Sequence, residues 1–242
     1  MIDLHCHILP GIDDRAGDPD TARRMLEREM LCGADRVILT PHFNPERQSL
    51  TDFLLERERS WERLQGVAGP GIELRLGAEV ACSFELLSMD LGSLTLGGSC
   101  YLLLELPAGR YPAFMERFAQ ELLGRGVIPI LAHVERCAYF RREPGLLKRL
   151  VEMGLLAQVT AAALTDRRDR NFARACLEHG LAQIVASDAH DLHSRPPRMD
   201  VLKGLPERVQ WMHRACTEAV WGNELPPYII VSDIRRGCFQ YR

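Results

Sequence analysis

Two histidines near the start of the chain are spaced so that they could bind one metal ion. They are His5 and His7, two residues apart in the run MIDLHCH. In a strand, alternate side chains point to the same face, so both imidazoles would reach the same ion. A pair with this spacing also occurs on surfaces and in cores, and by itself it indicates a metal site only weakly.

Residue types that bind metals recur where later apolar runs end. Six such runs are followed by a histidine or a carboxylate, namely His5 with His7, His42, Glu79, Glu105, His133, and Asp188 with His190. Charged side chains rarely lie against a core without a partner, so a cap or an ion pair explains one such position but not six. The mixture of imidazole and carboxylate suits Mn²⁺, Fe or Zn²⁺ and predicts a catalytic cluster of several ions.

The apolar runs alternate with helical patterns. Strands are predicted over 2–5, 36–40, 73–77, 101–105, 127–132, 156–160 and 183–186. Helices are predicted over 20–32, 51–65, 112–123, 144–152, 166–178 and 207–220, with a short helix and an irregular loop within 81–99. This order predicts βα units and a parallel sheet, and seven units fit a closed barrel slightly smaller than the eight-stranded form. An open doubly wound sheet is the alternative. In parallel barrels the active site lies at the carboxyl ends of the strands, where the candidate ligands fall.

The bulk composition is that of an ordinary globular protein and excludes some functions. The 242 residues, of which 46% are hydrophobic, fit a single domain over 1–242. A formal net charge of -3 offers no basic surface for nucleic acid. No apolar stretch reaches the ~18–20 residues of a membrane span, and the first residues do not look like a signal peptide. The eight cysteines form no C-x-x-C pair, which favours reduced thiols and a cytoplasmic location.

The order and spacing of these motifs resemble those of a known superfamily. The segments HCH, TPH, GAE, AH and SDAH are similar to the series of the PHP (polymerase and histidinol phosphatase) superfamily. Within it, the opening MIDLHCHILPGIDD and the later AHVER, QVTAAAL and SDAHDLHSRPP resemble the bacterial tyrosine-protein phosphatases of capsule and exopolysaccharide loci. The resemblance implies a distorted (β/α)₇ barrel with three divalent metal ions, with Mn²⁺ preferred over Fe or Zn²⁺.

The resemblance also implies a role for each candidate ligand. The first ion would be held by His5, His7, Glu79 and Asp188, the second by Glu79, Glu105 and His133, and the third by Asp14, His42 and His190. Arg136 and Arg195 would bind the phosphate, for which a planar guanidinium is well suited. Clustered ions lower the pKa of bound water, so the expected reaction is attack of a bridging hydroxide on phosphorus.

Several substrates fit such a site. The resemblance implies hydrolysis of phosphotyrosine on a protein, in particular the C-terminal tail of a bacterial tyrosine kinase that regulates capsular or exopolysaccharide synthesis. The alternatives are a small-molecule phosphatase such as histidinol phosphatase, a PHP nuclease, and a metal-binding regulator without turnover. A cysteine-based mechanism is disfavoured, because no cysteine is followed six positions later by an arginine. The sequence leaves open the natural substrate, the oligomeric state and the role of the tail after Pro226.

Four further residues lie near these motifs or share their chemistry. Asp13 competes with Asp14 for one ligand role, and alignment of the motif favours Asp14. Cys6 lies between two candidate ligands and is expected to be buried on the opposite face of its strand. His193 is ambiguous, because it falls in the loop that carries Arg195, whereas His213 is expected on the surface of the last helix.

Overall fold

A curled parallel sheet forms the centre of the computed structural model, which describes residues 1–13 and 17–225. Its strands are β1 (Ile2–Cys6), β2 (Arg36–Leu39), β3 (His42–Phe43), β4 (Glu73–Leu76), β5 (Glu79–Ala81), β6 (Tyr101–Glu105), β7 (Ile128–Leu131), β8 (Leu156–Thr160) and β9 (Ile184–Ala186). They pair in the orders β1-β2-β4 and β3-β5-β6-β7-β8-β9, always in parallel. Asp14 and the tail after Pro226 lie outside the described residues.

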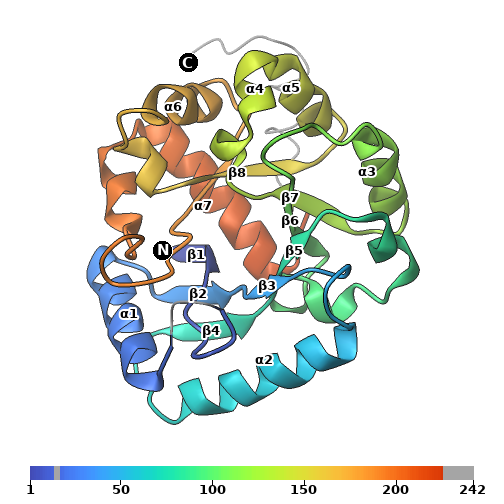
Figure 1. The fold of residues 1–242 in the computed structure, drawn as a ribbon. Coiled ribbons are helices and arrows are strands. Elements are labelled where there is room, and N and C mark those ends of the chain that lie inside the picture. Colours follow the sequence, from blue (N-terminus) through green and yellow to red (C-terminus); the bar gives the residue numbers. More distant parts are fainter. Residues whose placement is uncertain (14–16, 226–242) are drawn as a thin grey trace.

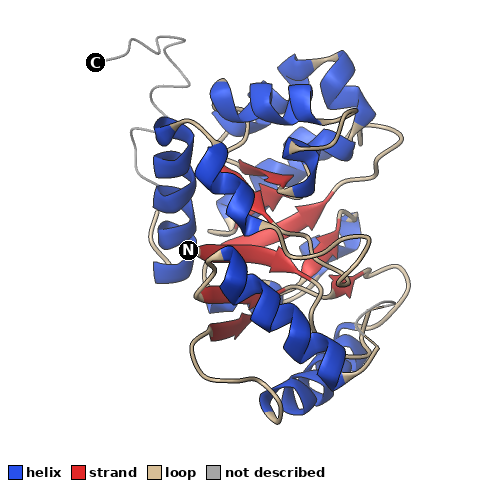
Figure 2. Cartoon of the chain, turned by 90° about the vertical axis from the view of Figure 1, so that its left-hand side faces the viewer, coloured by secondary structure: helices blue, strands red, loops and turns tan. Residues whose placement is uncertain are grey.

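Helices surround the strands (Figures 1 and 2). The α-helices are α1 (Pro19–Cys32), α2 (Leu50–Gln65), α3 (Met115–Gly124), α4 (Ala138–Arg142), α5 (Pro144–Glu152), α6 (Arg170–Glu178) and α7 (Glu207–Gly222). Short 3-10 helices are η1 (Phe84–Ser88), η2 (Gly92–Leu94), η3 (Leu96–Gly98), η4 (Val134–Arg136), η5 (Ala162–Leu164) and η6 (Met199–Gly204). Among the described helices, none is long and apolar enough to cross a membrane.

Two predicted strands are each interrupted and then continue as a second short strand. The strand conformation ends after β2 and after β4 and begins again, after two intervening residues, as β3 and β5. These two short strands were not predicted from the sequence. Backbone hydrogen bonds cross the break, from Gly77 N–H to the Leu39 carbonyl at 2.9 Å and from Glu79 N–H to the Pro41 carbonyl at 3.0 Å. Glycine is favoured at 77, because a Cβ there would lie 2.9 Å from the Leu96 side chain and 3.3 Å from the Leu96 Cα. The break places His42 and Glu79 at the starts of the paired strands β3 and β5.

The sheet curls until the segment after β9 lies beside β1. Cys6 and Ala189 form a parallel bridge, and the His7 N–H donates to the Ala189 carbonyl at 2.8 Å. The Asp188 N–H donates in turn to the His5 carbonyl at 2.8 Å. This arrangement confirms the predicted α/β barrel class, in the form of a half-barrel, over the open doubly wound sheet. It also brings the last candidate ligands next to the first.

The predicted helices are confirmed, with two shifted starts and one addition. The helix predicted from 166 begins at Arg170, because the Asp166 carboxylate accepts hydrogen bonds from the N–H groups of Arg168 and Asp169 and closes a turn there. The helix predicted from 112 begins at Met115, and α4 was not predicted.

The expected burial of Cys6 is confirmed. Its side chain is fully buried in the smaller of two apolar clusters, which packs α1 against β1 and β2. The thiol donates to the Ile38 carbonyl at 3.6 Å, and burial raises its pKa well above the ordinary value. Every cysteine in the described residues is free.

The expectation that His213 lies on the surface is wrong. The side chain is 4% exposed, and α7, on which it lies, packs against β1 and β9. The Val185 N–H of β9 donates to His213 Nδ1 at 3.2 Å, which requires a neutral ring. Burial, and then the positive charges of the N-terminus and Arg214, lower the pKa of His213 to about 3.

The buried imidazole makes stability depend on pH. Below a pH of about 6.5, the pKa of histidine in an unfolded chain, His213 is protonated in the unfolded state but stays neutral in the folded state. The free energy of unfolding therefore falls as the pH decreases from this value towards the pKa of His213 in the folded state. At about pH 4.5 this amounts to roughly 3 kcal/mol. His213→Asn, which keeps an acceptor for the Val185 N–H, should therefore lose less stability on acidification than the parent protein. Urea unfolding over this pH range measures the effect, with the exposed His179→Asn as control; parallel curves for all three proteins would contradict it.

Candidate metal centre

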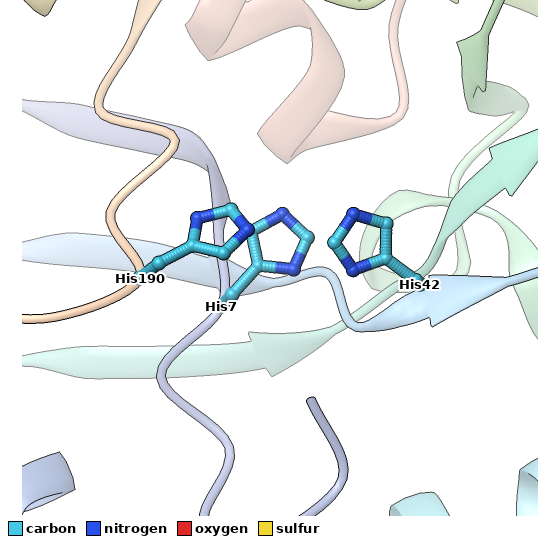
Figure 3. A group of neighbouring side chains, drawn as sticks. All are labelled: His7, His42 and His190. Atoms are coloured by element: carbon cyan, nitrogen blue, oxygen red, sulfur yellow. The ribbon is translucent and has the colours of Figure 1, made fainter. Parts of the chain in front are cut away.

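The described candidate ligands gather at the carboxyl side of the curled sheet. His5 and His7 come from β1 and its end, His42 and Glu79 from the starts of β3 and β5, Glu105 from the end of β6, His133 from the end of β7, and Asp188 and His190 from the segment after β9. Figure 3 shows the rings of His7, His42 and His190 converging from three separate segments. A cavity of about 480 Å³ opens over this group and is lined by His42, Glu105, His190 and Arg195 among others.

Four buried residues surround one point. His5 Nε2 and His7 Nε2 lie 3.0 Å apart, and each lies 3.2 Å from Glu79 Oε2 and 3.4 Å from Asp188 Oδ1. All four ligand atoms lie within 4.8 Å of one another, close enough for one cation to contact them together. The four residues predicted for the first ion are therefore adjacent in the structure, and their donor types suit a divalent cation.

Two further groups overlap with the first. Ligand atoms of His42, Glu79 and Glu105 lie within 4.8 Å of one another, and so do those of His7, His42 and His190. His133 Nε2 lies 2.7 Å from Glu79 Oε1 and 3.7 Å from Glu105 Oε1. The residues predicted for the second ion are thus adjacent, and the described members of the third set are as well. The ligand role predicted for Asp14 stays a prediction.

Outer hydrogen bonds orient the rings of His5 and His190. His5 Nδ1 lies 3.1 Å from Gln158 Oε1, and His190 Nδ1 lies 2.9 Å from the Asp188 carbonyl. An imidazole that donates through Nδ1 carries its lone pair on Nε2. His5 Nε2 lies 3.2 Å from Glu79 Oε2 and 3.4 Å from Asp188 Oδ1, and the His190 ring lies against that of His7 with centroids 3.9 Å apart. Such outer acceptors are the usual companions of metal-binding histidines.

Asp13 accepts hydrogen bonds from the rings of two further histidines, His7 and His42. Its Oδ2 lies 2.9 Å from His7 Nδ1, and its Oδ1 lies 3.0 Å from His42 Nδ1. Burial opposes ionisation of Asp13, but hydrogen bonds from His42 and then His7 outweigh it and lower the pKa of the carboxyl. The structure thus places Asp13 behind the two histidines, as a carboxylate that orients them.

The buried charges of the cluster depend on one another. Burial alone would raise the pKa values of Glu79 and Asp188, but the neighbouring histidines, first His5 for Glu79 and His7 for Asp188, hold them well below the ordinary range. Burial and the charge of His7 lower the pKa of His190 to about 3. Glu79 Oε2, Asp188 Oδ1 and His190 Nε2 are buried without a hydrogen-bond partner in the described structure. A cation would satisfy these acceptors together.

The backbone is in an uncommon conformation at two cluster residues. His133 has φ 30° and Asp188 has φ 50°, in the left-handed region that most residues avoid. The other described non-glycine residue with positive φ, Asn223, caps the end of α7, where this conformation is ordinary. Residues held in sparsely populated conformations are concentrated at functional sites, so this observation supports the site independently of side-chain type.

The two predicted phosphate-binding arginines meet at one oxygen. Arg195 donates to Asp188 Oδ2 at 3.1 Å, and Arg136 donates to the same oxygen. Each side chain is about one-third exposed, so both guanidinium groups border the cluster and can still reach an anion above it. His193 is exposed, and its backbone N–H donates to Asp191, so it is not part of the cluster.

Sequence analysis missed Gln158. This fully buried residue of β8 accepts from the His133 N–H at 2.9 Å and lies against His5 Nδ1. The sequence does contain an indication of its role, because an amide side chain inside an apolar strand is unusual and needs hydrogen-bond partners when it is buried. The sequence gives no indication of which partners it finds.

The chain is similar to known proteins over most of its length. Residues 1–211 match the family described as "Capsular polysaccharide synthesis, CpsB/CapC". Tyrosine-protein phosphatase YwqE of Bacillus subtilis is 34% identical over 208 residues, which cover 81% of this chain and 79% of that protein. Tyrosine-protein phosphatase CpsB of Streptococcus pneumoniae is 26% identical over 215 residues, 82% and 86% of the two chains. A chain from the crystal structures of YwqE and CpsB, described as unique metal-dependent tyrosine phosphatases, superposes with a TM-score of 0.80 at 29% identity, covering 93% of this chain and 95% of that one.

Replacement of Gln158 tests, in the absence of metal, how much its hydrogen bonds to His5 and His133 stabilise the protein. Gln158→Leu leaves the buried donors His133 N–H and His5 Nδ1–H without an acceptor, which should reduce the free energy of unfolding by roughly 1–3 kcal/mol. Urea unfolding in the presence of a chelator measures this change. The control is Gln210→Leu, which removes a half-buried amide that donates to the Leu205 carbonyl. Equal losses in the two variants would show that the amide of Gln158 has no special role.

Proposed function

Because the chain belongs to the CpsB/CapC family of capsular polysaccharide synthesis, we propose that it is a metal-dependent phosphatase that hydrolyses phosphotyrosine on a protein. The observation that carries the proposal is the common orientation of four histidines. His5, His7, His42 and His190 each turn Nδ1 to an outer acceptor. The Nε2 atoms of the first three lie 3.1–3.2 Å from Glu79 Oε2, a buried oxygen without a hydrogen-bond partner in the described structure. Relatives that bear the name tyrosine-protein phosphatase supply the substrate class.

We propose that the cluster holds three divalent ions, with Mn²⁺ ahead of Fe or Zn²⁺. The proposed ligands are His5, His7, Glu79 and Asp188 for the first, Glu79, Glu105 and His133 for the second, and Asp14, His42 and His190 for the third. The overlap of the observed groups at Glu79, His7 and His42 supports several neighbouring ions over a single one. The groups found among the described residues consist of imidazoles and carboxylates without a thiolate, which supports the choice of metals.

When bound, the ions supply a water of lowered pKa and neutralise charge on the phosphoryl group. The protein orients the substrate around them. Arg136 and Arg195 present guanidinium donors to the phosphoryl oxygens, in the forked geometry that suits a phosphate. Asp188 holds both guanidinium groups through one oxygen and so fixes their position. A tyrosine leaves as a phenolate with a pKa of about 10, well below that of an alcohol, so the leaving group needs little help from a general acid.

The substrate we propose is the tyrosine-containing tail of a bacterial kinase that regulates capsular or exopolysaccharide synthesis. The family's connection with capsular polysaccharide synthesis supports this choice. The proposed place of action is the cytoplasm, where free cysteines such as those observed are the rule.

The activity is tested by phosphate release from a phosphotyrosine peptide with Mn²⁺, with histidinol phosphate assayed in parallel. His42→Ala, which removes a ligand shared by two groups, should lower kcat/KM by about 100-fold or more, since even outer-shell changes cost 10- to 100-fold. His179→Ala, an exposed histidine at the end of α6, should leave the rate unchanged. A parent-like rate in His42→Ala would reject the proposed site, and preference for histidinol phosphate would reject the proposed substrate class.

The role of Asp13 is tested by metal binding. Asp13→Ala frees the Nδ1 atoms of His7 and His42, and the affinity for Mn²⁺ should fall about 10- to 100-fold. Competition with a fluorescent chelator measures the affinity, with the exposed Asp90→Ala as control. Asp14→Ala, measured in parallel, tests the ligand role predicted for that residue. An unchanged affinity in Asp13→Ala would mean that the two rings are oriented without it.

A further inference from the structure

Three adjoining cavities form a row that starts over the candidate metal ligands, and we refer to this row as the groove. The first is the cavity of about 480 Å³ over the candidate ligands, the second measures about 400 Å³ and the third about 550 Å³. The first and second share Asn44, Ala81 and Glu105, and the second and third share Glu46, Cys82, Ser83 and Pro107. The groove therefore runs from the site of chemistry over the loop after β5 and the start of η1.

The far end of the groove differs in chemistry from its start. Titratable and polar side chains line the first cavity, whereas Phe84, Phe114, Pro107 and Pro112 line the third. Phe84 is 48% exposed, although large apolar side chains usually lie inside. In the part of the chain that the structure describes, Trp211 is the other exposed aromatic residue, at 47%.

The ring of Phe84 is held in place. Its centroid lies 4.2 Å from that of Phe114 and 6.3 Å from that of Phe118, so one side of the ring packs on α3 and the segment before it. Its backbone opens η1, where the Ser83 hydroxyl accepts from the Glu85 N–H. A fixed aromatic ring at the edge of a cavity offers a surface for stacking, and little side-chain entropy remains to be lost on binding.

We propose that the third cavity, which Phe84 lines, binds an aromatic side chain of the same polypeptide that carries the phosphotyrosine. This inference rests on the proposed function, since a second side chain of the substrate is expected in the third cavity only if the phosphotyrosine binds in the first. The row of adjoining cavities suits an extended polypeptide, because a small phosphate ester bound in the first cavity would not reach the third. Glu46, Glu85 and Arg110 border the third cavity without a net positive charge, so its chemistry suits an apolar side chain over a second phosphate.

The arrangement makes Phe84 a specificity-determining residue. Aromatic pairs contribute about 0.5–1.5 kcal/mol beyond the area they bury, which corresponds to roughly a 2- to 10-fold effect on binding. The effect should fall on KM, because the contact is distant from the reacting atoms and is made equally in the ground state and the transition state.

The test uses phosphotyrosine peptides with a glycine and serine background and one phenylalanine placed at each flanking position in turn. In the parent protein, phenylalanine at one position, or at two neighbouring ones, should lower KM about 2- to 10-fold with kcat unchanged. This preference should disappear in Phe84→Ala and persist in Trp211→Ala, the control of equal exposure. Fluorescence anisotropy with the phosphonate analogue of the preferred peptide should give the same order of affinities without turnover.

A second variant covers the case in which Phe84→Ala fails to fold. Ala113→Glu, at an exposed position in the wall of the third cavity, adds bulk and charge there while leaving Phe84 in its packing. It should also abolish the preference. Peptide turnover with the same KM for every position of the phenylalanine would overturn the subsite and leave the proposed phosphatase intact. Failure of the parent protein to hydrolyse any phosphotyrosine peptide would overturn both.

Discussion

Lone pairs of imidazoles and carboxylates converge on one small buried volume at the strand ends, and the cost of removing them from water governs the rest of the site. Each buried polar atom without a partner costs about 1–3 kcal/mol, and a charged one costs more. Glu79 Oε2, Asp188 Oδ1 and His190 Nε2 are in this condition. Three such acceptors close together reduce the stability of the fold. Bound cations would offset this cost by contacting the acceptors.

The surrounding structure reduces this cost in layers. Outer acceptors, among them Asp13 and Gln158, hold the rings with their lone pairs inward. Arg136 and Arg195 balance the charge of Asp188 from the other side. The sheet provides the frame, because its parallel strands all present their carboxyl ends to the same side, and the segment after β9 joins β1 at the cluster.

The parts of this arrangement whose signals are local could be predicted from the sequence. A histidine or carboxylate after an apolar run can be recognised without its partners, which is why the ligands from His5 to His190 could be proposed. The strands β3 and β5 were missed, because two and three residues are too few to show a period. Gln158 was missed, because its role depends on His5, which lies 153 residues away. His213 could have been predicted as buried, since it follows Val209 and Met212 on the apolar stripe of α7 and precedes Cys216.

The left-handed backbone at His133 and Asp188 limits how these two positions can change over evolutionary time. Metal chemistry alone would accept glutamate or cysteine as a substitute donor at either position. The backbone narrows the choice, because apart from glycine the left-handed region is populated mainly by asparagine, aspartate and histidine. The residues that satisfy both demands are aspartate and histidine, the two that are present. A substitution that keeps both the proposed ligand role and this backbone conformation is therefore an exchange within that pair, unless the loop around it is rebuilt at the same time.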